Sequence, residues 1–167
     1  TGGTVFDGPA TVAPDGTWTV DSSVLTDGAY TVAATATDPA GNTSTDSSDF
    51  AVDTTAPIVA VVSPAGGSTT SDTTPPVSGT VNEPAAAVRV VITDSTGGIV
   101  FDGPATVAPD GTWTVDLAGA DVTLTDGGYT VSATAADPAG NTATDSNSFA
   151  VDSTAPAIAI TAPANGS

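Results

Sequence analysis

The sequence predicts an all-β protein made of β-sandwich domains in tandem, and three observations point to this. Val and Ala dominate the apolar residues and Thr is abundant, a composition that favours pleated strands over helices. Long blocks of sequence recur at about the length of one domain. Short runs of alternating apolar and polar residues lie between turn sequences rich in Gly, Pro and Asp.

The internal repeat organises the whole chain. Residues 1–21 recur as residues 96–116 with a single change, and residues 26–57 recur with a few changes as residues 125–156. The copies lie 95 residues apart in the first block and 99 in the second, because a longer loop precedes the second block in the later copy. A period near 99 residues is too long for a solenoid repeat and matches a whole sandwich domain.

This period divides the chain into one complete unit and parts of two others. We predict that residues 53–151 form a complete repeat, that residues 1–52 are the C-terminal half of a preceding repeat, and that residues 152–167 are the first strand of a following one. The chain opens in the middle of the pattern, so we interpret it as a piece of a longer protein. Near-identity between the copies indicates recent duplication. Such duplication suits a domain that adds length to a protein better than a domain with a specialised binding or catalytic site.

The complete unit contains about seven candidate strands. In order they are Ile58–Ser63, Pro76–Val81, Val88–Thr93, Ile99–Val107, Thr112–Leu117, Tyr129–Ala136 and Asn147–Val151. Alternation is clearest where Trp113 and Val115 share one face of a strand. The sequence Pro109–Gly111 is a hairpin turn, because proline presets φ and glycine accepts a positive φ. Seven short strands separated by turns predict a sandwich.

Two of the aromatic residues of the complete unit admit both a structural and a functional interpretation. Trp113 and Tyr129 could form a platform on which sugars stack. Trp113 alternates with Val115, however, which predicts a core position. Tyr129 follows Leu-Thr-Asp-Gly-Gly, the sequence of a tyrosine corner, in which the hydroxyl bonds back to the preceding loop. We therefore expect both side chains to be structural.

Composition and charge exclude several classes of function. The chain has no Cys, His, Met or Lys, and Arg89 is its only base against 19 acidic residues, for a net charge of −18. No ordinary base is present to activate a serine or threonine nucleophile, so we expect no enzyme activity. The negative charge opposes nucleic-acid binding. No apolar run approaches the about 20 residues of a membrane span. We expect Arg89 to pair with a neighbouring carboxylate.

Several sequence runs together resemble the bacterial Ig-like repeats of large surface adhesins and biofilm-associated proteins, many of which leave the cell by type I secretion. These runs are VDTTAP from Val52, VSGTVNEP from Val77, PDGTWTV from Pro109, LTDGGYTVSATAADPAGNTAT from Leu124 and FAVDSTAP from Phe149. The resemblance implies an Ig-like Greek-key sandwich. It also implies an extracellular or cell-surface role as an extender whose partners are the neighbouring repeats. In many members calcium binds at the domain junctions.

The threading of an Ig-like sandwich gives a separate reason to expect a metal. Three loops of the complete unit should return to the pole where the chain enters, bringing Glu83 and Asp137 towards Asp53, with Asp110 nearby. Asp27 of the preceding unit should approach the same junction. No Lys is available to neutralise these carboxylates, and Ca²⁺ prefers hard oxygen ligands. We predict calcium ligands at Asp53, Glu83 and Asp137.

Asp152 is the counterpart of Asp53 at the next junction and is predicted as a further calcium ligand. A simpler interpretation of these acids stays open beside the metal. Asp137 begins a hairpin loop in which it can cap the turn without metal, and Asp110 is explained in the same way by its own hairpin. Asp27 and Asp126 precede the tyrosine corners and are explained as turn residues.

Three functions follow from these features. The first is a structural extender of a secreted or cell-surface adhesin, stiffened by calcium between repeats. The second is a module that itself binds a glycan or a protein, although a recognition domain should vary its loops between copies, and here most loops are nearly unchanged. The third is an accessory sandwich of an extracellular enzyme, which a catalytic domain elsewhere in the parent chain would reveal.

Overall fold

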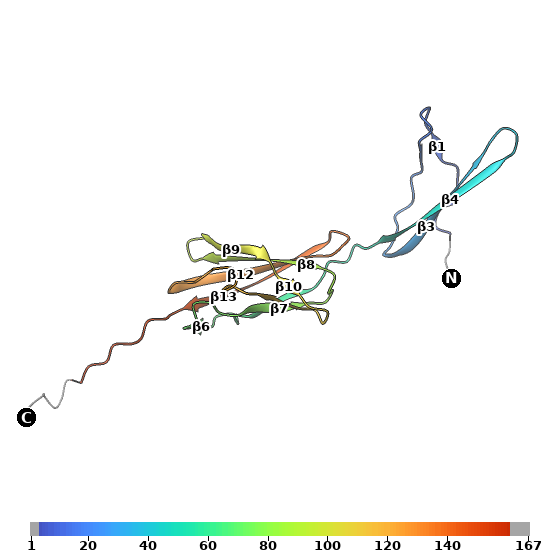
Figure 1. Ribbon diagram of the computed structural model, residues 1–167. Coiled ribbons are helices and arrows are strands. Elements are labelled where there is room, and N and C mark those ends of the chain that lie inside the picture. Colours follow the sequence, from blue (N-terminus) through green and yellow to red (C-terminus); the bar gives the residue numbers. More distant parts are fainter. Residues whose placement is uncertain (1–3, 161–167) are drawn as a thin grey trace, which may run out of the picture. The chain divides into compact units, whose positions relative to one another are not determined.

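The protein is described here by a computed structural model that covers residues 4–160 (Figure 1). The chain divides into two compact units, Thr1–Thr55 and Ala56–Ser167. Every regular element in the described range is a β-strand. No helix in this part of the chain has the length and apolar character needed to cross a membrane.

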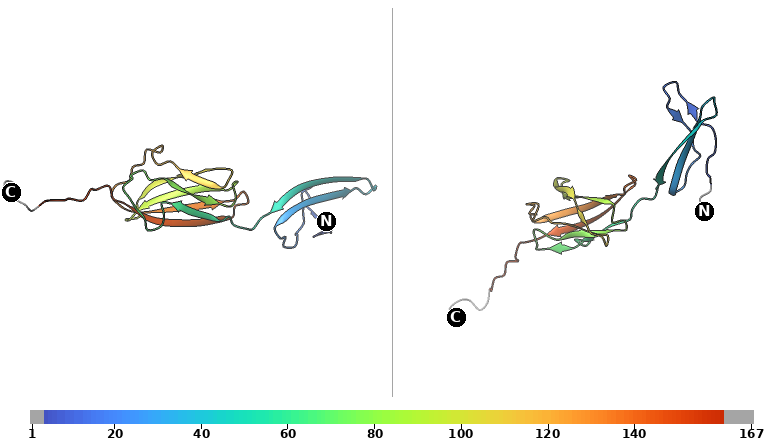
Figure 2. Two further views of the ribbon diagram at one scale, coloured as in Figure 1. Left: turned by 90° about the horizontal axis from the view of Figure 1, so that it is seen from below. Right: turned by 45° about the vertical axis from the view of Figure 1, so that its right-hand side comes forward.

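The second unit is a sandwich of two sheets, and Figure 2 gives two further views of it. One sheet has the order β10 (Thr106–Val107), β11 (Thr112–Val115), β7 (Val77–Val81) and β5 (Val59–Ser63). The other has the order β6 (Thr69–Thr70), β13 (Thr142–Val151), β12 (Gly127–Ala136), β8 (Ala87–Asp94) and β9 (Ile99–Pro104). Neighbours are antiparallel except β6, which runs parallel to β13. The predicted all-β Ig-like sandwich is confirmed.

Two details of the strand order differ from the prediction. The single strand expected over Ile99–Val107 is divided, because β9 pairs with β8 in one sheet and β10 pairs with β11 in the other. The amide of Ala105, between the two segments, donates to the carbonyl of Val88 at 2.8 Å. The short strand β6 was not predicted, since two threonines carry no alternating pattern. The chain therefore changes sheets directly after Gly103-Pro104, a turn-type sequence that the prediction of a single strand did not take into account.

The core lies between the two sheets and is built from the alternating positions. Trp113 is fully buried, and its Nε1 donates to the carbonyl of Thr80 at 3.2 Å. Its strand partner is Gly79, where a Cβ atom would lie 2.3 Å from the indole and 1.9 Å from the carbonyl oxygen of Ala60. The core position predicted for Trp113 is confirmed, so this indole offers no face to a sugar.

The tyrosine corner is also confirmed. The Tyr129 hydroxyl donates to the carbonyl of Thr125 at 2.9 Å and accepts from the Thr125 amide at 3.1 Å. In the first unit the hydroxyl of Tyr30 donates to the carbonyl of Thr26 at 2.7 Å. The loop before each of these strands is therefore attached to the strand by a side chain that the repeat retains.

The first unit consists of two two-stranded sheets. One contains β1 (Thr11–Val12) and β2 (Trp18–Thr19), and the other contains β3 (Gly28–Thr37) and β4 (Thr43–Val52). These strands repeat the sequences of β10, β11, β12 and β13. No residue of 4–55 is buried, and Trp18 is 46% exposed whereas Trp113 is 0% exposed. The same sequence therefore forms similar hairpins with very different burial.

The segment predicted as the first strand of a following repeat lies at the end of the chain. Residues 152–160 form no strand, and the side chains of Ile158 and Ile160 are exposed. Residues 161–167 lie outside the described part of the chain.

Candidate metal centre

Three acidic side chains come together from segments far apart in the sequence. Asp53 follows β4 in the linker, Glu83 follows β7, and Asp137 follows β12. Each offers a carboxylate oxygen, and these oxygens all lie within 4.8 Å of one another. The predicted set Asp53, Glu83 and Asp137 is therefore one spatial group. Carboxylates at such a separation are the hard oxygen donors that Ca²⁺ takes in proteins.

Asp137 is the buried member of the group, with 6% exposure. One carboxylate oxygen accepts the Asn141 amide at 2.8 Å, and the other accepts Nδ2 of Asn141 at 2.8 Å. The bond from the Asn141 side chain is the main reason that the pKa of Asp137 lies below its usual value. Asp38 accepts the same two bonds from Asn42 in the first unit. The turn-capping role is therefore real, and it holds an ionised carboxylate in a fixed direction.

Capping leaves Asp137 as an anionic donor. Besides the two bonds from Asn141, the backbone amides of Ala139 and Gly140 contribute to its lowered pKa. A carboxylate held by a turn still carries the negative charge that attracts a hard cation, so the turn interpretation and the metal interpretation are compatible at this residue.

Glu83 is positioned by the loop after β7. The Asn82 side chain accepts the Ile58 amide at 2.6 Å, and the Asn82 amide donates to the Ile58 carbonyl at 3.1 Å. A turn then forms, in which the Ala86 amide donates to the carbonyl of Glu83 at 2.9 Å. These bonds tie the loop to the start of the sandwich, where the linker that carries Asp53 enters.

Asp53 is an exposed residue whose own linker is ordered by hydrogen bonds. Its Oδ1 accepts the Thr55 amide at 3.0 Å. The linker residues Thr54 and Thr55 donate in turn to Asp27: the Thr54 amide at 3.0 Å, the Thr54 hydroxyl at 2.7 Å and the Thr55 hydroxyl at 2.7 Å. The Thr54 hydroxyl bond is the main reason that the pKa of Asp27 is lowered.

The charge around the acidic group is uncompensated by basic side chains. Arg89 is the only base in the sequence, and its guanidinium pairs with Asp102 through two bonds of 2.7 Å. This confirms the predicted surface pair, which is worth little because the Arg89 side chain is 68% exposed. Like charges held close together repel unless a cation intervenes. The donor set and its charge therefore fit a hard divalent cation.

The remaining predicted or considered residues lie elsewhere. The Asp152 amide donates to the Thr70 carbonyl at 2.9 Å, its carboxylate accepts the Thr154 amide at 3.1 Å, and its role as a ligand stays a prediction. Asp110 accepts the Thr112 amide and hydroxyl at 3.0 and 2.7 Å, as its hairpin interpretation requires. Sequence reasoning missed the hydrogen bonds made by the linker hydroxyls. The sequence did contain a signal for these bonds. The run Asp-Thr/Ser-Thr-Ala-Pro occurs in both copies, and each time a Thr-Asp-Gly turn precedes it by the same distance.

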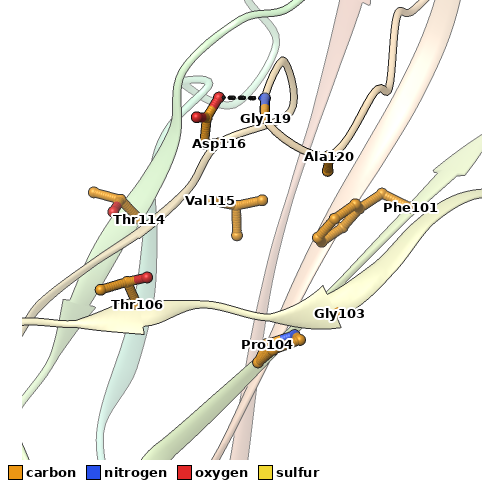
Figure 3. A pocket seen from close by; sticks show the side chains of 9 residues that line it. All are labelled: Phe101, Gly103, Pro104, Thr106, Thr114, Val115, Asp116, Gly119 and Ala120. Carbon is orange, nitrogen blue, oxygen red and sulfur yellow. Dashed lines mark hydrogen bonds between the residues drawn. The ribbon is translucent and has the colours of Figure 1, made fainter.

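A separate surface depression of about 400 Å³ lies beside β9, β10 and the loop after β11 (Figure 3). Phe101 and Val115 supply its apolar side. Asp116 is its one ionisable side chain, and that carboxylate accepts the Gly119 amide at 2.9 Å. This arrangement provides neither a nucleophile with a base nor a set of metal ligands.

Comparison with known proteins gives a family match along most of the chain. A sequence model described as "Bacterial Ig-like domain" matches residues 1–54 and 63–153. No curated protein matches the sequence. A solved tetra-tandem repeat in the extending region of a large adhesion protein is 37% identical, over 87% of this chain and 38% of its own, with a TM-score of 0.49. This chain thus spans well under half of that structure.

Two further solved structures are similar over a shorter part of the chain. CopC from Methylosinus trichosporium OB3b is 25% identical, over 57% of this chain and 94% of its own, with a TM-score of 0.45. An engineered protein is 26% identical, over 57% of this chain and 20% of its own, with a TM-score of 0.47.

Proposed function

Given that the chain belongs to the bacterial Ig-like domain family, we propose that it is a structural extender of a secreted or cell-surface adhesin. A spacer must repeat, must be stiff, and needs no reactive group. The sequence repeats almost unchanged at a period of one domain and lacks Cys, His and Lys. Its two tryptophans belong to the repeated framework, and the one in the complete sandwich is buried.

We further propose that calcium stiffens the linker by binding Asp53, Glu83 and Asp137. The observation that carries this proposal is the approach of three carboxylate oxygens to within 4.8 Å in a chain with a single, already paired base. A cation there would bond the linker residue Asp53 to two loops of the sandwich. Bending of the linker would then require breaking metal–oxygen bonds. Extracellular calcium modules bind with Kd of about 10⁻⁴ to 10⁻³ M.

Calcium is expected to stabilise the chain against unfolding. At 10 mM Ca²⁺ and such a Kd, linkage predicts a gain of about 1.4–2.7 kcal/mol in the free energy of unfolding of the sandwich. The measurement is urea denaturation at constant ionic strength, with Ca²⁺ or with a chelator, followed by isothermal titration with Ca²⁺. Glu83→Gln should remove most of the gain, because it replaces one anionic ligand with a neutral amide of the same shape.

The matched control is Asp121→Asn. Asp121 has a positive φ of 56°, a conformation that Asn adopts well, so this change removes one carboxylate without disturbing the fold. It should leave the calcium response intact. An equal loss in Asp121→Asn and Glu83→Gln would mean that calcium acts through general charge screening, and the proposed ligands would be rejected.

The extender role also predicts an absence of specific sugar recognition. The full chain should give no reproducible signal on a glycan array in the presence of Ca²⁺, because Trp113 and Tyr129 of the sandwich are buried. Trp18→Ala tests whether any signal comes from the exposed tryptophan of the first unit. Heat-denatured chain serves as the background control. A glycan bound by the folded chain alone would favour the binding-module interpretation.

A further inference from the structure

One carboxylate in each unit holds the linker that leaves that unit. In the complete sandwich, Oδ1 of Asp126 accepts the Ser153 amide at 2.8 Å and the Ser153 hydroxyl at 2.6 Å. Its Oδ2 accepts the Thr154 hydroxyl at 2.5 Å. Asp126 thus binds two successive linker residues through both of its oxygens, across 27 and 28 positions of sequence.

The same arrangement occurs in the first unit. Asp27 accepts the amide and hydroxyl of Thr54 on one oxygen and the hydroxyl of Thr55 on the other. The residue that donates twice is Thr in this copy and Ser in the other, so the hydroxyl is retained although the side chain differs. None of residues 4–55 is buried, so the bonds in the first unit do not depend on a complete sandwich core.

These carboxylates are themselves attached to a rigid base. Asp126 follows Thr125, whose amide and carbonyl both bond the hydroxyl of Tyr129. The strands on either side are paired up to Gly127 and Val151, one residue from the carboxylate and two from the linker serine. The Asp126 carboxylate therefore links the two chain segments just beyond the last paired residues of β12 and β13.

Each linker also turns back on the acid that precedes it. The Thr55 amide donates to Asp53 at 3.0 Å, and the Thr154 amide donates to Asp152 at 3.1 Å. Asp53 and Asp152 are equivalent residues of the two copies. Each accepts an amide from a linker whose Thr or Ser hydroxyls already donate to Asp27 or Asp126. In the first unit, Thr55 is bonded to both aspartates, to Asp53 through its amide and to Asp27 through its hydroxyl.

We propose that Asp27 and Asp126 are positioning residues that form a linker clamp, defined as this aspartate with the two hydroxyl residues it binds. The clamp orders the linker that leaves each repeat without needing a metal. In the first unit it also orients Asp53, and this second part rests on the calcium function proposed above. The clamp predicts that a repeat of this kind requires Ser or Thr at both positions after the junction aspartate.

Charge explains why an aspartate fills this role. Hydrogen bonds to an ionised acceptor are about twice as strong as neutral ones. The bonds from the Ser153 hydroxyl, the Thr154 hydroxyl and the Ser153 amide lower the pKa of Asp126 to about 2, so the carboxylate is ionised at neutral pH. An asparagine has a single, neutral acceptor oxygen, and its NH₂ group would face the remaining hydroxyl.

The clamp is tested by NMR hydrogen exchange on the full chain without calcium. Asp126→Asn should speed exchange of the Ser153 amide by about tenfold or more, since that amide loses a charged acceptor. Ser153→Ala should speed exchange at the neighbouring Thr154, and Ser153→Thr should behave as the parent does, because Thr occupies the equivalent position in the first unit. The matched control is Asp110→Asn, which removes the same type of acceptor from Thr112 in a hairpin.

Positioning of Asp53 is tested by calcium titration of Asp27→Asn. The matched control is Asp15→Asn, which removes an equal charge from the same unit and the same pair of bonds from a threonine, Thr17. We expect calcium affinity to fall several-fold in Asp27→Asn and to stay within twofold of the parent in Asp15→Asn. The amide spectrum of each variant verifies that its fold is retained.

The outcomes separate the two parts of the proposal. Unchanged exchange of Ser153 in Asp126→Asn, with Ser153→Ala equally silent, overturns the linker clamp. Equal calcium affinity in Asp27→Asn and Asp15→Asn overturns the positioning of Asp53 alone. If the parent chain binds no calcium, the proposed metal function fails together with that positioning, while the exchange experiment still decides whether the linker clamp exists.

Discussion

Replacing Trp113 with alanine is expected to lower the free energy of unfolding of the sandwich by about 3–5 kcal/mol. The indole is fully buried between the two sheets, where its ring lies over Gly79 and its Nε1 bonds the Thr80 carbonyl. Truncation removes the largest side chain of the core and leaves a cavity that rigid sheets close only in part. The measurement is urea denaturation followed through the amide signals of Val90 and Val131, which lie in this core.

The repeat supplies a control for this change. Trp18 occupies the same place in the repeated sequence but is 46% exposed. Trp18→Ala should therefore leave the denaturation midpoint of the sandwich unchanged. If Trp113→Ala cost less than about 1 kcal/mol, the indole would not be filling the core as described.

Replacing Gly79 with alanine is expected to destabilise the sandwich by at least about 1–3 kcal/mol, the usual cost of overpacking a core. The added Cβ would lie 1.9 Å from the Ala60 carbonyl oxygen and 2.3 Å from the Trp113 ring. The first of these atoms is backbone of the adjacent strand β5, so relief requires the two strands to separate. The change in unfolding midpoint and the loss of the β5–β7 amide cross-peaks report this effect.

Gly128→Ala is the matched glycine control. Gly128 lies in β12, and a Cβ there would meet only the Ser95 side chain at 3.8 Å, an ordinary contact. The repeat places alanine, Ala29, at the equivalent position of the first unit. The substitution should change the unfolding free energy by less than about 0.5 kcal/mol. Equal effects at Gly79 and Gly128 would contradict the close approach of Trp113 to β7.

Much of the acidic group was open to prediction because threading constrains it. In a sandwich of short strands, alternate loops return to one pole, so loops after β7 and β12 had to approach the entering linker. That rule brought Glu83 and Asp137 to Asp53 without any knowledge of side-chain geometry. The threading rule could not distinguish a turn-capping role of Asp137 from a metal-binding role, because both roles need the same carboxylate in the same loop.

The linker clamp was beyond such reasoning for a physical reason. Thr-Asp-Gly before a tyrosine corner explains Asp126 as a local turn residue, and nothing in the local sequence connects it to Ser153. The connection arises because β12 and β13 pair along their full length and bring the two ends together at one edge. Hydrogen bonds between residues that are distant in sequence depend on strand register, which alternation restricts only to steps of two residues.

Local chemistry and the repeat were sufficient for the fold class, most strand positions, the tyrosine corner and the core role of Trp113. These follow from periodicity and turn propensity, which act over a few residues. Burial, the change of sheet at Ala105 and the partners of each aspartate required the folded chain, as the contrast between Trp18 and Trp113 demonstrates. Identical neighbours along the chain produce the same hairpin, but a side chain is removed from water only when a second sheet covers it.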